Sequence, residues 1–145
     1  MTDAKMARID VLNRDRCLEL LRQDEIGRLA VLADGGPLIL PVNYRMDGET
    51  IVFRTDPGLK LDQGVRSHAC FEIDQFDRGN RSGWSVIAAG RLEEVTLYES
   101  KTWKRIHDLP VEPWAGGAKD HWVRLIPSRI TGRHVPASAT GSSVG

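Results

Sequence analysis

Apolar and polar residues alternate with a period of two along much of this chain, and that period predicts β-strands. In the first predicted strand, for example, Leu29 and Val31 share one face. Asp47-Gly48 is a hairpin signal between two such segments, and Gly90 allows a bend inside a long one. The predicted strands cover residues 26–33, 38–46, 50–55, 69–74, 83–95 and 121–135, the last with a break near Pro127.

Three segments instead favour helices. Asn13 is a potential N-cap for an amphipathic helix over 14–23, and a shorter helix is predicted over 59–65. Thr96 and Glu99 form a capping box for a helix that ends near residue 107. Consecutive strands with few interposed helices predict a mainly β fold, a β-barrel with peripheral helices, rather than alternating βαβ units.

Pro41 interrupts the second predicted strand. A proline has no N–H group to donate to a β-ladder, so it is confined to edges, bulges or places where no strand lies alongside. The sequence therefore predicts an open edge or an irregularity at Pro41.

Composition sets limits on the partners and location of this chain. A length of 145 residues suits one domain, which we expect over 13–135, with a flexible N-terminus over 1–12 and a disordered tail over 136–145. Lys plus Arg and Asp plus Glu both number 20, so no long-range attraction to nucleic acid or anionic lipid is expected. The N-terminus has no signal-peptide pattern, and no stretch approaches a membrane span; we expect a cytoplasmic protein.

The two cysteines have none of the spacing of a zinc site or redox pair. We expect Cys17 and Cys70 to be reduced residues of the core. The four histidines are dispersed, so no metal site is predicted. Neither a Walker motif nor GxGxxG is present, and Ser85 lacks the glycine of a nucleophile elbow two residues later. No catalytic residue is assigned.

The segment "RTDPGLKL", residues 54–61, has the residue types that bind an anion. A phosphate needs hydroxyl or N–H donors and a cation at close range, and a turn that opens a helix supplies them. Thr55, the Gly58 turn and Lys60 meet these needs. The alternative is a plain turn with solvated basic side chains. Trp84 is a second candidate, either covering an aromatic ligand or packing in a core or interface.

The ordered segments "IGRLAV", "PLILPVNYRMDGETIVFRT", "GLKL", "ACFEID" and "SGWSVIAAGRLEEV" resemble the pyridoxamine 5'-phosphate oxidase-like family, in particular its small actinobacterial and nitroimidazole-resistance-like members. The resemblance covers roughly residues 15–100. It implies a split β-barrel, a homodimer, and FMN in a cleft between the protomers. The C-terminal segment lacks the pattern that holds pyridoxal phosphate in the oxidase itself, so oxidation of pyridoxamine phosphate is not predicted.

The resemblance also implies which residues contact FMN. Thr55 and Lys60 would bind the phosphate, with Arg54 as a second cation, and the isoalloxazine would lie along Pro41-Val42-Asn43-Tyr44. Trp84 and Ser85 would approach from the other protomer. The residues assigned to FMN in this way are Pro41, Val42, Asn43, Phe53, Arg54, Thr55, Lys60, Leu61, Trp84 and Ser85.

The function implied is that of an FMN-dependent oxidoreductase acting on a small organic substrate. Two alternatives stay open. One is a reductase that uses the deazaflavin F420, whose more anionic tail would engage Arg45 and Arg66. The other is a non-catalytic protein that binds flavin or haem.

Overall fold

The computed structural model describes residues 8–33, 35–55, 68–95, 100–114 and 121–137. The elements follow one another along the chain as β1 (Asp10–Leu12), α1 (Arg14–Gln23), β2 (Ile26–Ala33), β3 (Gly36–Asp47), β4 (Thr50–Thr55), β5 (His68–Asp77), β6 (Ser82–Glu94), α2 (Lys101–His107) and β7 (His121–Val135). The predicted helix over 59–65 lies outside the described residues.

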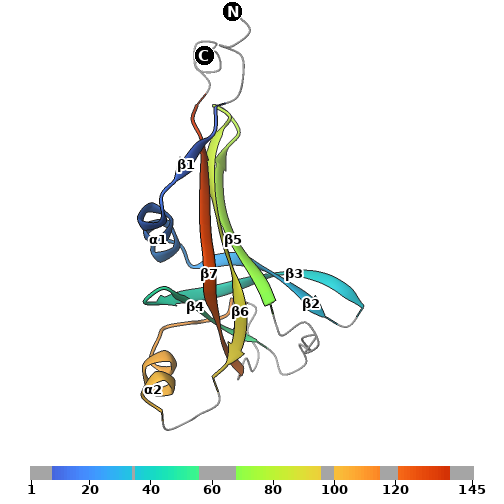
Figure 1. Cartoon of the computed structure of the whole chain (residues 1–145), viewed down its shortest axis with the longest axis vertical. Helices are drawn as coiled ribbons and strands as arrows, with labels where there is room; N and C mark the ends of the chain where they lie inside the picture. The colour runs from blue at the N-terminus through green and yellow to red at the C-terminus, as the bar shows by residue number, and fades with distance from the viewer. Residues whose placement is uncertain (1–7, 34, 56–67, 96–99, 115–120, 138–145) are drawn as a thin grey trace, which may run out of the picture.

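The strands form one antiparallel sheet in the order β1-β7-β4-β3-β2-β5-β6. β6 also pairs with β7, so the sheet closes into a barrel, and the predicted mainly β barrel is confirmed. In Figure 1, β5, β6 and β7 run along the long axis of the molecule, whereas β2, β3 and β4 run across it in the lower half. No helix among the described segments is long and apolar enough to cross a membrane.

Alternate residues of the strands point into the barrel and form its core. Leu29, Phe53, Phe71 and Leu125 are each no more than 1% exposed, and each buried side chain of this size stabilises the fold by about 1.5–3 kcal/mol. Gly27 lies beneath the Phe71 ring, where a Cβ would come within 2.2 Å of it. Side chains therefore fill the barrel interior around Gly27 and Phe71.

Helix α1 packs its apolar face against this core, and its bounds match the helix predicted over 14–23. Asn13 caps it by accepting a hydrogen bond of 2.8 Å from the N–H of Arg16. Its buried side chains are those of the predicted apolar stripe, namely Cys17, Leu18, Leu20 and Leu21.

Helix α2 packs on the outside of the barrel. Ile106 packs with Val52, Val111 and Trp122 in a second apolar cluster, and Arg105 makes two hydrogen bonds to Asp47, of 2.8 and 3.0 Å. The helix begins at Lys101, capped by Ser100, while Thr96 and Glu99 of the predicted capping box lie outside the described residues. This packing brings the loop that follows α2 against β3 and β4.

The long β6–β7 pair is irregular where the sequence predicts a bend. The register shifts between Ala89 and Gly90, opposite Pro127. A Cβ on Gly90 would lie 2.0 Å from the carbonyl oxygen of Ile126, so the two backbones approach closely only because residue 90 is glycine.

Two features differ from the sequence predictions. β1 was not predicted; its three residues pair with Gly132–His134 of β7. Cys70 was expected in the core but is exposed, because Ala69 and Phe71 on either side of it take the inward positions of β5. Cys17 is buried, and neither cysteine forms a disulfide.

Candidate functional site

β3 and β4 separate part-way along their length, and the opening between them is the candidate site. Their ladder ends at the pair Tyr44–Phe53. Beyond it, residues 36–43 of β3 pair only with β2, and Arg54 and Thr55 of β4 pair only with β7, within the described residues. We call this opening the β3–β4 fork; its arms are residues 37–43 and residues 54–55.

Pro41 lies on the open edge of the fork. Tyr44 donates its N–H to the Glu25 carbonyl at 3.0 Å, so in the alternating pattern of an antiparallel pair the N–H of Val42 also faces β2. The nitrogen of Pro41 then faces the opening, where it costs the ladder no hydrogen bond. This agrees with the open edge predicted from the sequence.

The second arm ends at Thr55, whose side chain is half-buried opposite His121. Phe53 is only 1% exposed, with its ring in the barrel core and strands paired on both sides, so it offers a ligand no accessible surface. The strand runs from Thr50 to Thr55, as its sequence pattern predicts. Lys60 and Leu61 lie outside the described residues.

Arg54 has partners that the sequence did not indicate. Its guanidinium lies 5.1 Å from the centroid of the Trp122 ring, and its Nη1 donates a hydrogen bond of 3.0 Å to the carbonyl of Val111. With these two contacts, Arg54 is not the fully solvated basic side chain of the plain-turn alternative. Arg54 therefore joins β4 to the loop after α2, and its part as a second cation for a phosphate stays a prediction.

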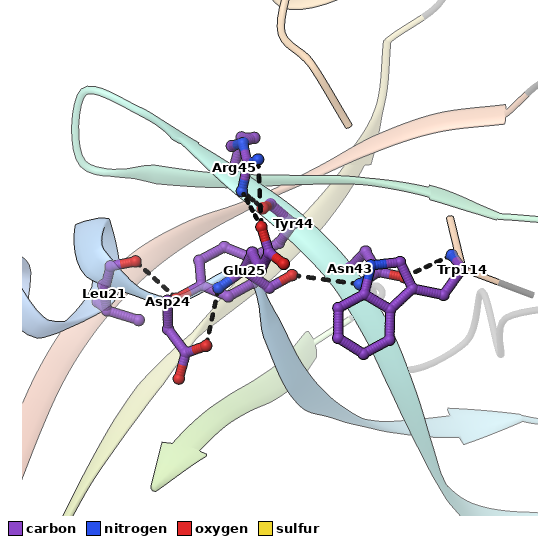
Figure 2. A network of polar contacts seen from close by, with 7 residues as sticks. All are labelled: Leu21, Asp24, Glu25, Asn43, Tyr44, Arg45 and Trp114. Atoms are coloured by element: carbon purple, nitrogen blue, oxygen red, sulfur yellow. Dashed lines mark hydrogen bonds and ion pairs between the residues drawn. The ribbon is translucent and has the colours of Figure 1, made fainter. Parts of the chain in front are cut away.

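Asn43 makes the matching contact from the other arm. Its Oδ1 accepts a hydrogen bond of 2.9 Å from the N–H of Trp114, and its Nδ2 lies 3.4 Å from the Glu25 carbonyl. Figure 2 shows Asn43 between Glu25 and Trp114, with Arg45 above Glu25. Asn43 therefore fixes the Trp114 loop at the apex of the fork.

Tyr44 anchors the strand behind this network. Its hydroxyl donates a hydrogen bond of 2.6 Å to the carbonyl of Leu21 in α1 (Figure 2). Burial raises the pKa of this phenol, and the charge of Asp24 adds to the effect. Tyr44 therefore stays protonated near neutral pH and acts as a structural donor, not a base.

Polar side chains also cover the outer face of the sheet next to Pro41. Arg28 lies opposite Pro41 on one side and Glu72 on the other, and its Nη1 lies 3.2 Å from Glu72 and 3.1 Å from Asp74. Burial, followed by the neighbouring Asp74, raises the pKa of Glu72 to about 7, although Arg28 opposes the change. The carboxyl of Glu72 therefore changes its charge near neutral pH. The described residues contain no cluster suited to a metal ion.

Trp84 and Ser85 lie far from the fork within one chain. Trp84 pairs with His134 near the end of β7, whereas Thr55 pairs with His121 at its start. His121 and His134 are thirteen residues apart along β7, which corresponds to roughly 40 Å of strand. Figure 1 agrees, since the β5–β6 hairpin lies at the upper end of the molecule and β4 in the lower half. One chain therefore does not bring Trp84 and Ser85 to the predicted site residues at the fork.

Sequence reasoning missed Trp114 and Glu25. Trp114 is 68% exposed, and a tryptophan directly after Pro113 in the proline-containing segment "LPVEPW" was an available signal. The partner of its N–H, however, lies 71 residues earlier in the chain.

Comparison with known proteins identifies the family. The family model for pyridoxamine 5'-phosphate oxidase matches residues 13–134. An uncharacterized protein of Mycobacterium tuberculosis is 30% identical over 135 residues, covering 88% of this chain and 86% of that protein. A structure from Corynebacterium glutamicum, provisionally assigned as a pyridoxamine 5'-phosphate oxidase, has a TM-score of 0.73 at 29% identity and covers 90% of this chain and 96% of its own.

A second solved structure, the FAD-binding protein of Mycobacterium smegmatis, has a TM-score of 0.62 at 27% identity; the match covers 89% of this chain and 100% of that one. The order of strands, the closed barrel and these matches agree with the split-barrel fold expected from the sequence. The chain belongs to the pyridoxamine 5'-phosphate oxidase family.

Proposed function

We propose that the protein binds FMN in the β3–β4 fork, against a second copy of the chain, and acts as a flavin-dependent oxidoreductase on a small organic molecule. The observation that carries this proposal is the open edge of β3. Residues 37–43 have no strand partner on that side within the described residues. The N–H of Ile39 and the carbonyls of Ile39 and Pro41 face this side, and a planar ring with donors and acceptors along one edge satisfies such groups.

The other arm fits the phosphate of FMN. Thr55 is half-buried at the end of β4, so its hydroxyl is available to a phosphate oxygen, and Lys60 follows five residues later. The flavin would supply the electron transfer, while the chain's own residues bind it, orient it and exclude water.

A flavin is further supported by the FAD-binding relative from M. smegmatis. The deazaflavin alternative gains no support, because Arg45 already pairs with Glu25 at 3.4 Å and Arg66 lies outside the described residues. FMN remains the proposed form.

Two observations support a homodimer. Trp84 and Thr55 lie too far apart in one chain to contact the same flavin, so a joint site needs Trp84 from a second copy. An apolar groove of about 460 Å³ also lies on the outer face of β2, β3, β5 and β6, with Ile39 66% exposed on its border. A second copy of the chain covering this groove would remove that apolar surface from water.

The test is titration of FMN into the apo-protein and its variants. Thr55→Val and Lys60→Ala should each weaken binding by about 1–3 kcal/mol, because each loses a charge-assisted hydrogen bond. Thr55→Ser, which keeps the hydroxyl, and Lys104→Ala, which removes an exposed lysine of α2, should bind FMN like the wild type. Equal affinity in all four variants would refute the phosphate assignment.

Two further measurements test whether the protein is an enzyme and whether it is a dimer. NADH or NADPH should bleach the bound flavin under anaerobic conditions, and an added acceptor should restore its colour; a flavin that neither reductant bleaches indicates a binding protein. Light scattering on the eluting protein should give the mass of two chains, and a monomer would contradict the shared site.

A further inference from the structure

A pocket of about 380 Å³ lies at the apex of the β3–β4 fork, outside the open edge proposed for the flavin. Its floor comes from β3 and the end of the α1–β2 connection, and its wall from the loop that follows α2. The lining residues are Glu25, Asn43, Tyr44, Arg45, Pro110, Glu112 and Trp114.

The loop that forms the wall is held at two points. Asn43 and Arg54 would form the next pair of the β3–β4 ladder, but each binds the loop instead, at the N–H of Trp114 and the carbonyl of Val111. Pro110 and Pro113 further restrict the backbone between these contacts. The backbone that carries the exposed indole of Trp114 is therefore held in place before any ligand binds, which lowers the entropic cost of binding.

Two acidic residues and one basic residue line this pocket, namely Glu25, Glu112 and Arg45, so its lining has a net negative charge. Arg45 is matched by Glu25, its partner at 3.4 Å. Glu112 is exposed and has no ion pair within the described residues, and Asp24 lies next to Glu25, whose N–H it accepts at 2.8 Å. An anionic ligand would meet like charges here, whereas a cationic one would be attracted.

We propose that this pocket binds a planar organic cation, stacked on the indole of Trp114 and attracted by Glu112. An aromatic face beside carboxylates is the arrangement that recognises such ions, since the ring quadrupole and the carboxylate both favour positive charge. Asn43 lines this pocket and also belongs to the open edge of β3 that is proposed to bind the flavin. The cation would therefore be the substrate of the flavin site, and this one point rests on the proposed function.

A charge series of one ring system tests the proposal. Calorimetric titrations of the apo-protein would use 1-methylnicotinamide as the cation, nicotinamide as the neutral compound and nicotinate as the anion. We expect the cation to bind about 5- to 30-fold more tightly than nicotinamide, and nicotinate to bind more weakly than either. Equal binding of the three compounds, or preference for nicotinate, would overturn the proposal.

Variants of the pocket residues test whether the cation binds at Trp114 and Glu112. Trp114→Ala should weaken binding of the cation about 5- to 30-fold, whereas Trp114→Phe should keep most of it. Glu112→Gln should lower the affinity for the cation about threefold and leave that for nicotinamide unchanged. Glu19→Gln, which removes an exposed carboxylate outside the pocket, is the matched control and should have no effect. Unchanged affinity in Trp114→Ala would place the cation elsewhere and refute the inference.

The same titrations with FMN separate this inference from the proposed function. Binding of the cation to a protein that does not bind FMN supports the pocket and refutes the flavin site. Binding of FMN without binding of the cation supports the flavin site and refutes the pocket.

Discussion

Asn43 and Arg54 occupy the two positions at which the β3–β4 ladder would continue, yet each binds the loop after α2 rather than pairing with the other. Asn43 holds the N–H of Trp114, and Arg54 holds the carbonyl of Val111. The loop is thus bound to both strands at the point where their pairing ends. The same loop forms the wall of the Trp114 pocket.

Removal of the Asn43 amide should free the Trp114 end of the loop. Asn43→Ala is expected to lower the free energy of unfolding by about 1 kcal/mol, through one lost hydrogen bond, and to speed hydrogen exchange at the Trp114 amide. Asn43→Asp keeps an acceptor oxygen and should protect that amide better. Equal exchange rates in the wild type and Asn43→Ala would show that the hydrogen bond does not hold the loop.

Arg54 should stabilise the folded protein through its planar guanidinium and not only through its charge. Arg54→Ala is expected to lower the free energy of unfolding by about 1–2 kcal/mol, measured by urea denaturation, because the stacking on Trp122 and the bond to Val111 are lost. Arg54→Lys keeps the charge but loses the stacking plane, so it should recover less than half of that loss. Full recovery by lysine would contradict this account.

Gly90 should tolerate no side chain. Gly90→Ala places a Cβ against the Ile126 backbone, so the β6–β7 pair must shift, at an expected cost of about 2–3 kcal/mol in unfolding free energy. Gly79→Ala is the control, because its Cβ would meet only the Asp77 side chain, at 3.2 Å, and it should cost less than about 1 kcal/mol. Similar thermal stability of the two variants would contradict the close approach.

Glu72 should make the protein less stable as the pH rises toward neutrality. Its pKa of about 7 in the folded protein lies above the ordinary value of 4.5, so the folded state binds more protons than the unfolded chain between these pH values. The stabilisation is therefore complete below about pH 4.5 and is lost as the pH rises through about 7. The neighbouring charged groups are Arg28 and Asp74, while the residues opposite on β6, Ile87 and Ser85, carry no charge.

Urea denaturation at pH 5, 6 and 8 checks this prediction. Glu72→Gln removes the titrating group, so the variant should be more stable than the wild type at pH 8, and the difference should shrink as the pH falls toward 5. Glu19→Gln is the control and should follow the wild type at each pH. A constant difference between Glu72→Gln and the wild type would refute the raised pKa.

The sequence by itself determined the elements whose causes are local. The helix over 14–23 follows from the Asn13 cap and the spacing of its apolar residues, and the strand over 26–33 and the Asp47-Gly48 hairpin follow from period and turn chemistry. Pro41 likewise predicted an open edge or an irregularity, because a residue without an N–H group cannot donate to a β-ladder in any strand.

Only the tertiary structure decided the contacts between segments far apart in the chain. β1 is a strand because β7 lies beside it, Arg54 stacks on Trp122 across the β4–β7 pair, and Asn43 meets Trp114 because α2 packs on the barrel. The separation of Trp84 from Thr55 likewise appears only once β7 is seen to run between them. Period and propensity describe neighbours along the chain, whereas these contacts depend on how the barrel closes.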